Sequence, residues 1–138
     1  MKVKDIMTQE VQVIHPGDSL RRAAEKMSSN DLGFLPVIED DQLVGVITDR
    51  DLVVRAVARG MNSEATLGRD LMTAPAIYCF DDQNVKEVAK IMEKDQIRRL
   101  VVLSRDNNRL AGVVSLGDIA NNATEEVSGK VLEKVSEP

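Results

Sequence analysis

The sequence contains few of the residues from which specialised catalytic or metal sites are built. It has one cysteine, Cys79, and one histidine, His15, among 138 residues. A single cysteine excludes an internal disulfide and argues against a cysteine-rich zinc site. The glycines match neither a P-loop nor the dinucleotide pattern G-x-G-x-x-G. With no serine–histidine–aspartate set and no metal-ligand cluster, the sequence argues against an enzyme, and we expect no catalytic or metal-binding residues.

Aromatic residues and long apolar runs are also scarce. Aromatics make up 2% of the chain and hydrophobic residues 43%, so the core must consist of aliphatic side chains and methionine. Such a composition suits sheets covered by helices. No segment approaches the ~20 apolar residues that a membrane-spanning helix needs, and the N-terminus lacks the apolar run of a signal peptide. We therefore expect a cytoplasmic protein without a membrane partner.

The chain lacks an excess of basic residues. Its formal net charge is −5, and acidic and basic side chains are interspersed. Because proteins that bind nucleic acid usually present a basic face, the charge argues against a nucleic-acid partner.

An internal repeat organises the sequence. The segment DIMT at 5–8 recurs as DLMT at 70–73, and GVITDRD at 45–51 recurs as GVVSLGD at 112–118. The second pair is spaced slightly more widely than the first, and a two-residue insertion near 106–109 explains the difference. We divide the chain into repeat 1 (1–60), a linker (61–67), repeat 2 (68–123) and a C-terminal tail (124–138).

Each repeat is predicted to have the order β-α-β-β-α. The fold class is therefore α/β (α+β), and two repeats packed sheet to sheet with pseudo-twofold symmetry would bury the sheet faces that one small repeat leaves open. A cleft between the repeats is then the expected ligand site. Hydrophobic periodicity and turn residues give the elements: strands at 11–14, 34–38, 43–48, 76–80, 99–104 and 110–114, helices at 19–28, from 49, at 84–94 and 116–123, and a partial helix at 127–135.

The repeated phrase has two compatible interpretations. A Ser or Thr three residues before an acidic residue predicts a capping box at a helix start, worth ~1 kcal/mol. The same geometry suits a nucleotide: the hydroxyl and the free N–H groups at a helix start can bind phosphate, and the carboxylate can accept hydrogen bonds from ribose hydroxyls. The pairs concerned are Thr48 with Asp51 and Ser115 with Asp118.

Taken together, the motifs KDIMT, LPVI, GVITDRD, DLMT, RRLVV and GVVSLGD resemble a pair of CBS domains, a Bateman module, over about residues 2 to 122. The resemblance is to small stand-alone bacterial CBS-pair proteins, including the hypoxic-response type. It implies a homodimer and a regulatory ligand, an adenine nucleotide (AMP, ADP or ATP) or else NAD or S-adenosylmethionine. Because no effector domain is fused to the repeats, the output would act on a separate, unknown regulated protein.

The resemblance also implies roles for individual residues. Thr48 and Ser115 would contact phosphate, and Asp51 and Asp118 would hold ribose hydroxyls. The strands that follow Thr8 and Thr73, which contain Val13 and Tyr78, would enclose adenine together with two runs of strand residues. Those runs are Leu35, Pro36 and Val37 in repeat 1, and Leu100 and Val101 in repeat 2.

The two repeats depart from the family pattern differently. Family members often carry a His-Arg pair before the Leu-Pro-Val run; Arg98 and Arg99 stand there in repeat 2, but repeat 1 has Gly33-Phe34. Repeat 2 has Val101 where proline is usual, and Arg50 of the first phrase is replaced by Gly117 in the second. We therefore expect unequal sites, with Arg50, Arg98 and Arg99 converging on one anion, and we favour the Thr48–Asp51 pocket. The alternative is a ligand-free interaction dimer in which the phrases are only helix caps.

Overall fold

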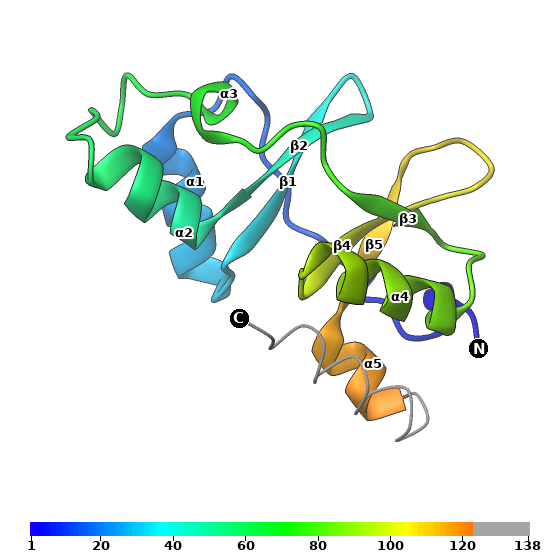
Figure 1. The fold of residues 1–138 in the computed structure, drawn as a ribbon. Coiled ribbons are helices and arrows are strands. Elements are labelled where there is room, and N and C mark those ends of the chain that lie inside the picture. The colour runs from blue at the N-terminus through cyan, green and yellow to red at the C-terminus, as the bar shows by residue number, and fades with distance from the viewer. Residues whose placement is uncertain (123–138) are drawn as a thin grey trace. The chain divides into compact units, whose positions relative to one another are not determined.

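The computed structural model describes residues 1–122, and the partial helix expected at 127–135 lies outside them. The chain forms two compact units. Unit 1 consists of Met1–Val11 and the chain from Ile77 onward, and unit 2 is Gln12–Ala76. Figure 1 shows the helices and strands of both.

Unit 2 is built around an antiparallel hairpin. Its core is aliphatic apart from one methionine, as the composition predicts, and contains Ile14, Leu20, Ala23, Met27, Leu35, Val37, Ile47, Leu52, Ala56 and Leu71. Its elements are α1 (Leu20–Asn30), β1 (Phe34–Glu39), β2 (Gln42–Thr48), α2 (Asp49–Asp51), the π-helical η2 (Leu52–Val57) and α3 (Gly68–Leu71).

Unit 1 contains a three-stranded sheet in which β3 pairs with β4 in parallel and β4 pairs with β5 antiparallel. Its elements are η1 (Val3–Asp5), β3 (Tyr78–Phe80), α4 (Val85–Asp95), β4 (Arg99–Leu103), β5 (Leu110–Ser115) and α5 (Leu116–Asn122). Its buried core consists of Val3, Cys79, Val85, Val88, Ala89, Met92, Leu100, Val102, Val114, Leu116 and Ile119. The predicted α/β class is confirmed.

The repeat is visible in the two long helices, α1 and α4, which have equal lengths and occupy corresponding places in the two repeats. Side-chain oxygens of Ser19 and Asn84 cap their N-termini by accepting hydrogen bonds from Arg22 and Lys86 N–H. Both helices end at a residue in the left-handed conformation, Asp31 or Gln96 (φ 53° and 54°). Equivalent caps explain why the same helix length recurs.

The strand predicted at 11–14 is wrong, because only a single parallel bridge forms there, between Ile14 and Val37. The Ile14 N–H donates to the Pro36 carbonyl (3.0 Å). To extend this parallel ladder toward residue 11, the next hydrogen bond would need an N–H donor at position 36. Proline has no N–H, so the pairing stops at Ile14. Val101 stands at this place in repeat 2, where β3 forms a parallel strand with β4.

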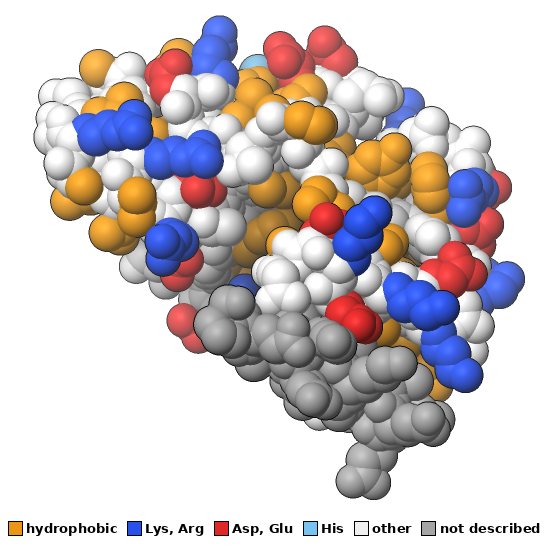
Figure 2. Space-filling model, in the orientation of Figure 1, with side chains coloured by type: hydrophobic (Ala, Val, Ile, Leu, Met, Phe, Trp, Pro, Cys, Tyr) orange, Lys and Arg blue, Asp and Glu red, His pale blue; other side chains and the backbone are white. Residues whose placement is uncertain are grey.

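The helix expected from Asp49 forms, but its continuation, η2, is π-helical. Three valines of η2 face solvent: Val53, Val54 and Val57 are 59%, 49% and 70% exposed. Figure 2 shows hydrophobic side chains on the surface of this helix. An apolar helix face of this kind is typical of an interaction surface.

The expected linker, 61–67, packs against the start of α1. The Leu20 N–H donates to the Thr66 carbonyl (2.8 Å), and the Arg21 N–H donates to the Ser63 carbonyl (2.9 Å). The Arg21 guanidinium also pairs with Glu64 (2.9 Å). These bonds attach the segment to unit 2.

The compact units do not follow the sequence repeats, because each Met-Thr segment pairs with the sheet of the other repeat. In unit 1, Thr8 and Val113 exchange two backbone hydrogen bonds of 2.9 and 3.0 Å. In unit 2, Thr73 and Val46 do the same at 2.9 and 3.0 Å. The short segments therefore cover the outer edges of β5 and β2.

Glycine at the start of each repeated phrase permits this pairing. A Cβ atom on Gly45 would lie 2.9 Å from the Thr73 carbonyl oxygen and 2.9 Å from the Met72 sulfur. A Cβ atom on Gly112 would lie 2.6 Å from the Thr8 oxygen. All three distances are shorter than an ordinary contact, and the two backbone oxygens cannot move aside without breaking the pairing.

We predict that Gly45→Ala and Gly112→Ala each destabilise the protein by ~1–3 kcal/mol, because the added methyl group separates the paired segments. Gly117→Ala is the control: the nearest atom to its Cβ is Ser115 Oγ at 3.6 Å, and alanine favours the helix by ~1 kcal/mol. Urea unfolding of the three variants measures the difference. Equal effects at Gly112 and Gly117 would contradict the steric explanation.

Burial also determines the chemistry of Cys79. The side chain is 1% exposed within the unit 1 core. Burial, and secondarily the negative charge of Asp81, raises the pKa of the Cys79 thiol from 9.0 to about 12. The thiolate is therefore suppressed in the folded protein, and the residue serves as a small core side chain.

We predict that Cys79 does not react with a thiol-exchange reagent at pH 8 in the native protein and reacts at once after unfolding in urea. Because the folded pKa lies above the unfolded one, the unfolded chain loses the proton first, and the free energy of unfolding should fall as the pH rises from 9 toward 12. Cys79→Ser controls for reaction elsewhere. Stoichiometric labelling of the native protein would contradict the prediction.

Candidate functional site

The capping boxes predicted from the repeated phrase are present in both repeats. In unit 2, the Thr48 N–H donates to Asp51 Oδ2 (2.9 Å) and the Asp51 N–H donates to Thr48 Oγ1 (3.1 Å). In unit 1, the Ser115 N–H donates to Asp118 Oδ2 (2.9 Å) and the Asp118 N–H donates to Ser115 Oγ (3.0 Å). Each box uses Oδ2 of its carboxylate, and all four residues are half-buried.

Strand pairing brings the predicted residues of unit 1 onto one face of its sheet. Direct partners in a sheet share a face, and neighbours along a strand alternate. The core side contains Cys79, Leu100, Val102 and Val114. The opposite, non-core face is defined by the pairs Arg99 with Ser115, Val101 with Val113, Tyr78 with Val101, and Thr8 with Val113.

Unit 2 repeats this arrangement on its hairpin. Its non-core face is defined by the pairs Phe34 with Thr48, Pro36 with Val46, and Val46 with Thr73. The Val13 carbonyl, next to the Ile14 bridge, accepts a hydrogen bond from the Lys26 ammonium group.

Three predicted site residues, Leu35, Val37 and Leu100, point to the other side. They are 0% exposed and belong to the hydrophobic cores. Their side chains therefore do not line a site on the non-core face, and only their backbone atoms can contribute to one. Pro36 and Val101, one position along each strand, carry the side chains on that face.

The predicted basic residues lie on different units. Arg98 and Arg99 belong to unit 1, and Arg50 to unit 2. The Arg98 carbonyl accepts the Leu116 N–H (2.8 Å), so the chain before β4 abuts the start of α5. Arg98 and Arg99 are exposed, and neither forms an ion pair within the described residues. The convergence of all three on one anion remains a prediction.

Repeat 1 has a carboxylate at the corresponding place. A Cβ atom on Gly33, the residue equivalent to Arg98, would lie 2.9 Å from Asp49 Oδ2. The Asp49 N–H donates to the Gly33 carbonyl (3.0 Å), as Leu116 does to Arg98. The two units thus share this backbone hydrogen bond. At this place unit 1 has the cationic side chains of Arg98 and Arg99, whereas unit 2 has the carboxylate of Asp49.

Sequence reasoning missed two parts of the sites. Val46 and Val113 lie in the middle of the non-core faces, and the alternation along each strand would have identified them. Arg55 lies 3.7 Å from Asp51 (Nε to Oδ1), one helical turn away. Spacing of i, i+4 was the available signal for this pair.

Among residues 1–122, no three His, Cys, Asp or Glu side chains gather as metal ligands do. No helix in the same range is long and apolar enough to cross a membrane.

Comparison with known proteins supplies the family. The CBS domain model matches residues 3–57 and 68–125. The uncharacterized protein YlbB of Bacillus subtilis is 38% identical, covering 99% of this chain and 92% of its own. Hypoxic response protein 1 of Mycobacterium tuberculosis is 31% identical, covering 98% and 94%.

Solved structures agree. Hypoxic Response Protein I, crystallised with two coordinated zinc ions, has a TM-score of 0.81 at 32% identity, over 90% of this chain and 100% of that one. CBSX2, solved in complex with AMP, has a TM-score of 0.75 at 29% identity (88% and 95% covered). The CBS domain pair of MJ0100, solved with 5'-methylthioadenosine and S-adenosyl-L-methionine, has a TM-score of 0.77 at 29% identity (88% and 94% covered). The chain belongs to the CBS-domain family, as a tandem pair of CBS domains.

Proposed function

We propose that this protein is a non-catalytic regulator that binds an adenosine-containing ligand of the AMP, ADP or ATP class. The observation that carries the proposal is that each unit places a hydroxyl–carboxylate pair at the end of an apolar, non-core sheet face. An adenine ring needs an apolar surface, and ribose and phosphate need acceptors and donors beside it. Relatives solved with AMP or with S-adenosylmethionine support this ligand class.

Unit 1 has the chemistry to hold each part of such a ligand. Asp118 Oδ1, which the capping box does not use, is available to accept a ribose hydroxyl. The Ser115 hydroxyl and the guanidinium of its strand partner Arg99 are suited to phosphate. Tyr78 is 45% exposed and its ring packs edge-to-face on Phe80, with centroids 5.5 Å apart. An aromatic ring fixed in this way offers a stacking surface for adenine.

We infer that unit 1 provides the stronger site, although the sequence favoured the Thr48–Asp51 pocket. Arg98 and Arg99 add positive charge there, whereas unit 2 has Asp49 beside Gly33. Repulsion between a phosphate and this carboxylate weakens binding at unit 2. Asp51 also has a cationic neighbour, Arg55, which competes for its Oδ1.

The output of the regulator is proposed to pass through its surface. The exposed valines of η2 form an apolar helix face suited to a homodimer contact. Occupancy of the ligand sites would then alter how the dimer presents itself to a separate regulated protein in the cytoplasm. Ligand binding shifts such an equilibrium only by its difference in affinity for the two states.

The test is a thermal-shift screen of nucleotide-free protein with AMP, ADP, ATP, NAD and S-adenosylmethionine. A ligand at a hundred times its Kd stabilises the folded state by ~2.7 kcal/mol, which raises Tm by roughly 5–10 °C. Asp118→Ala should abolish most of the shift, because it removes the acceptor for ribose. Asp51→Ala is the matched variant, which loses the same type of helix cap but should retain most of the shift.

An absence of any shift in nucleotide-free protein would overturn the proposal in favour of a ligand-free interaction dimer. A shift that both variants retain would place the ligand elsewhere on the protein. Chromatography of the mixture measures whether the nucleotide is converted to a product. Such a conversion would contradict the non-catalytic assignment.

A further inference from the structure

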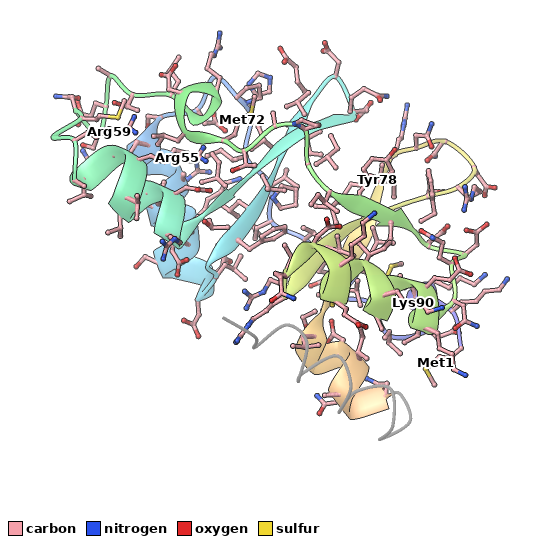
Figure 3. All side chains as sticks on the ribbon, viewed as in Figure 1. Met1, Arg55, Arg59, Met72, Tyr78 and Lys90 are labelled. Carbon is pink, nitrogen blue, oxygen red and sulfur yellow. The ribbon has the colours of Figure 1, made fainter. Side chains whose placement is uncertain are left out.

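Arg55 makes contacts that have no counterpart among the described residues of repeat 2. Its Nε lies 3.7 Å from Asp51 Oδ1, and its Nη1 donates to the carbonyls of Leu71 (3.1 Å) and Met72 (3.3 Å). Figure 3 shows Arg55 on its helix and Met72 on the neighbouring segment. One guanidinium thus joins a candidate ligand-binding carboxylate to the end of α3.

The segment held by Arg55 connects the two units along the chain. Immediately after Met72, Thr73 pairs with Val46 on the edge of β2. Unit 2 ends at Ala76, and Ile77 begins the next part of unit 1. The Leu71–Thr73 segment therefore lies a few residues before the point at which the chain passes from unit 2 into unit 1.

The part of repeat 2 that the structure describes lacks this link. The residue equivalent to Arg55 is Asn122, whose side-chain amide donates to the Asp118 backbone carbonyl (2.9 Å). Among residues 1–122, no cation pairs with the Asp118 carboxylate. The two aspartates thus have the same cap and different outer neighbours, which provides an internal control.

We propose that Arg55 is a positioning residue that couples the Asp51 carboxylate to the seating of the Leu71–Thr73 segment on β2. The ligand part of this inference rests on the proposed function, in which Asp51 accepts a ribose hydroxyl at the weaker site, that of unit 2. A hydroxyl that donates to Asp51 Oδ1 competes with Arg55 Nε for that oxygen. Arg55 then loses the anion that orients it, and its bonds to the two carbonyls weaken. By linkage, a firmly seated segment lowers the affinity at Asp51 to the same degree.

The first test needs no ligand. Asp51→Asn keeps an oxygen for the Thr48 N–H but removes the charge that faces Arg55. We expect the Thr73 and Val46 amides to exchange with deuterium about two- to fivefold faster in this variant, as suits the loss of a partly exposed ion pair. Exchange is measured residue by residue by NMR on the full-length protein.

Asp118→Asn is the matched control, because it weakens the same cap in the repeat without the arginine. Exchange at the equivalent Thr8 and Val113 amides should stay at the wild-type rate. Arg55→Gln should reproduce the effect at Thr73, and the double variant with Asp51→Asn should add nothing further, since both changes break one link. Unchanged Thr73 exchange in Asp51→Asn, or equal acceleration at Thr8 in Asp118→Asn, would overturn the proposal.

The second test adds AMP at a concentration that saturates the remaining thermal shift of Asp118→Ala, so that the weaker site at Asp51 is filled as well as the site at Asp118. Exchange at Thr73 should rise in the wild type and not rise further in Arg55→Gln. AMP binding that leaves Thr73 exchange unchanged in the wild type would overturn the coupling. Failure of AMP to bind would overturn the proposed function instead, and the ligand-free variants would still decide whether Arg55 links Asp51 to the segment.

Discussion

The pairing of each Met-Thr segment with a strand of the opposite repeat is the interaction on which the rest of the structure depends. It closes the exposed edges of β2 and β5 with two backbone hydrogen bonds each. An open edge would offer unpaired donors and acceptors to other chains. It also fixes Thr8 and Thr73 beside the central valines of the non-core faces. The glycines of the repeated phrase, Gly45 and Gly112, serve this approach of backbones, so they are required for the fold before any ligand is considered.

Much of this architecture could be predicted from the sequence, because the same local patterns occur twice. The helix caps at Ser19 and Asn84, the hairpins and both capping boxes depend on residues within a few positions of one another. Such local preferences agree with the final fold, as expected of a sequence that specifies one structure. The capping box and the candidate ligand site were predicted together, since a hydroxyl and a carboxylate one turn apart serve both roles.

What could not be predicted depends on contacts between distant segments. Nothing near Thr8 indicates that its partner is Val113, and nothing near Pro36 indicates that its missing N–H would reduce an earlier strand to the single bridge at Ile14. Arg55 could be paired with Asp51 by spacing, but its bonds to the backbone carbonyls of Leu71 and Met72 carry no sequence signal, because any residue supplies a carbonyl. By contrast, the burial of Leu35 and Val37 in the core could have been predicted, because alternate residues of a strand point to the same face of the sheet.

The exchange of segments has a consequence for how such a protein can be divided. A polypeptide of repeat 1 by itself would contain the hairpin of unit 2 without the strand partner that covers it, and a Met-Thr segment with no sheet to join. It would have to borrow the missing segment from a second molecule, as in domain swapping. The covalent joining of the repeats turns that association between molecules into one within a single chain, at a high effective concentration. The boundary between the two sequence repeats is therefore a poor place to divide the protein into fragments.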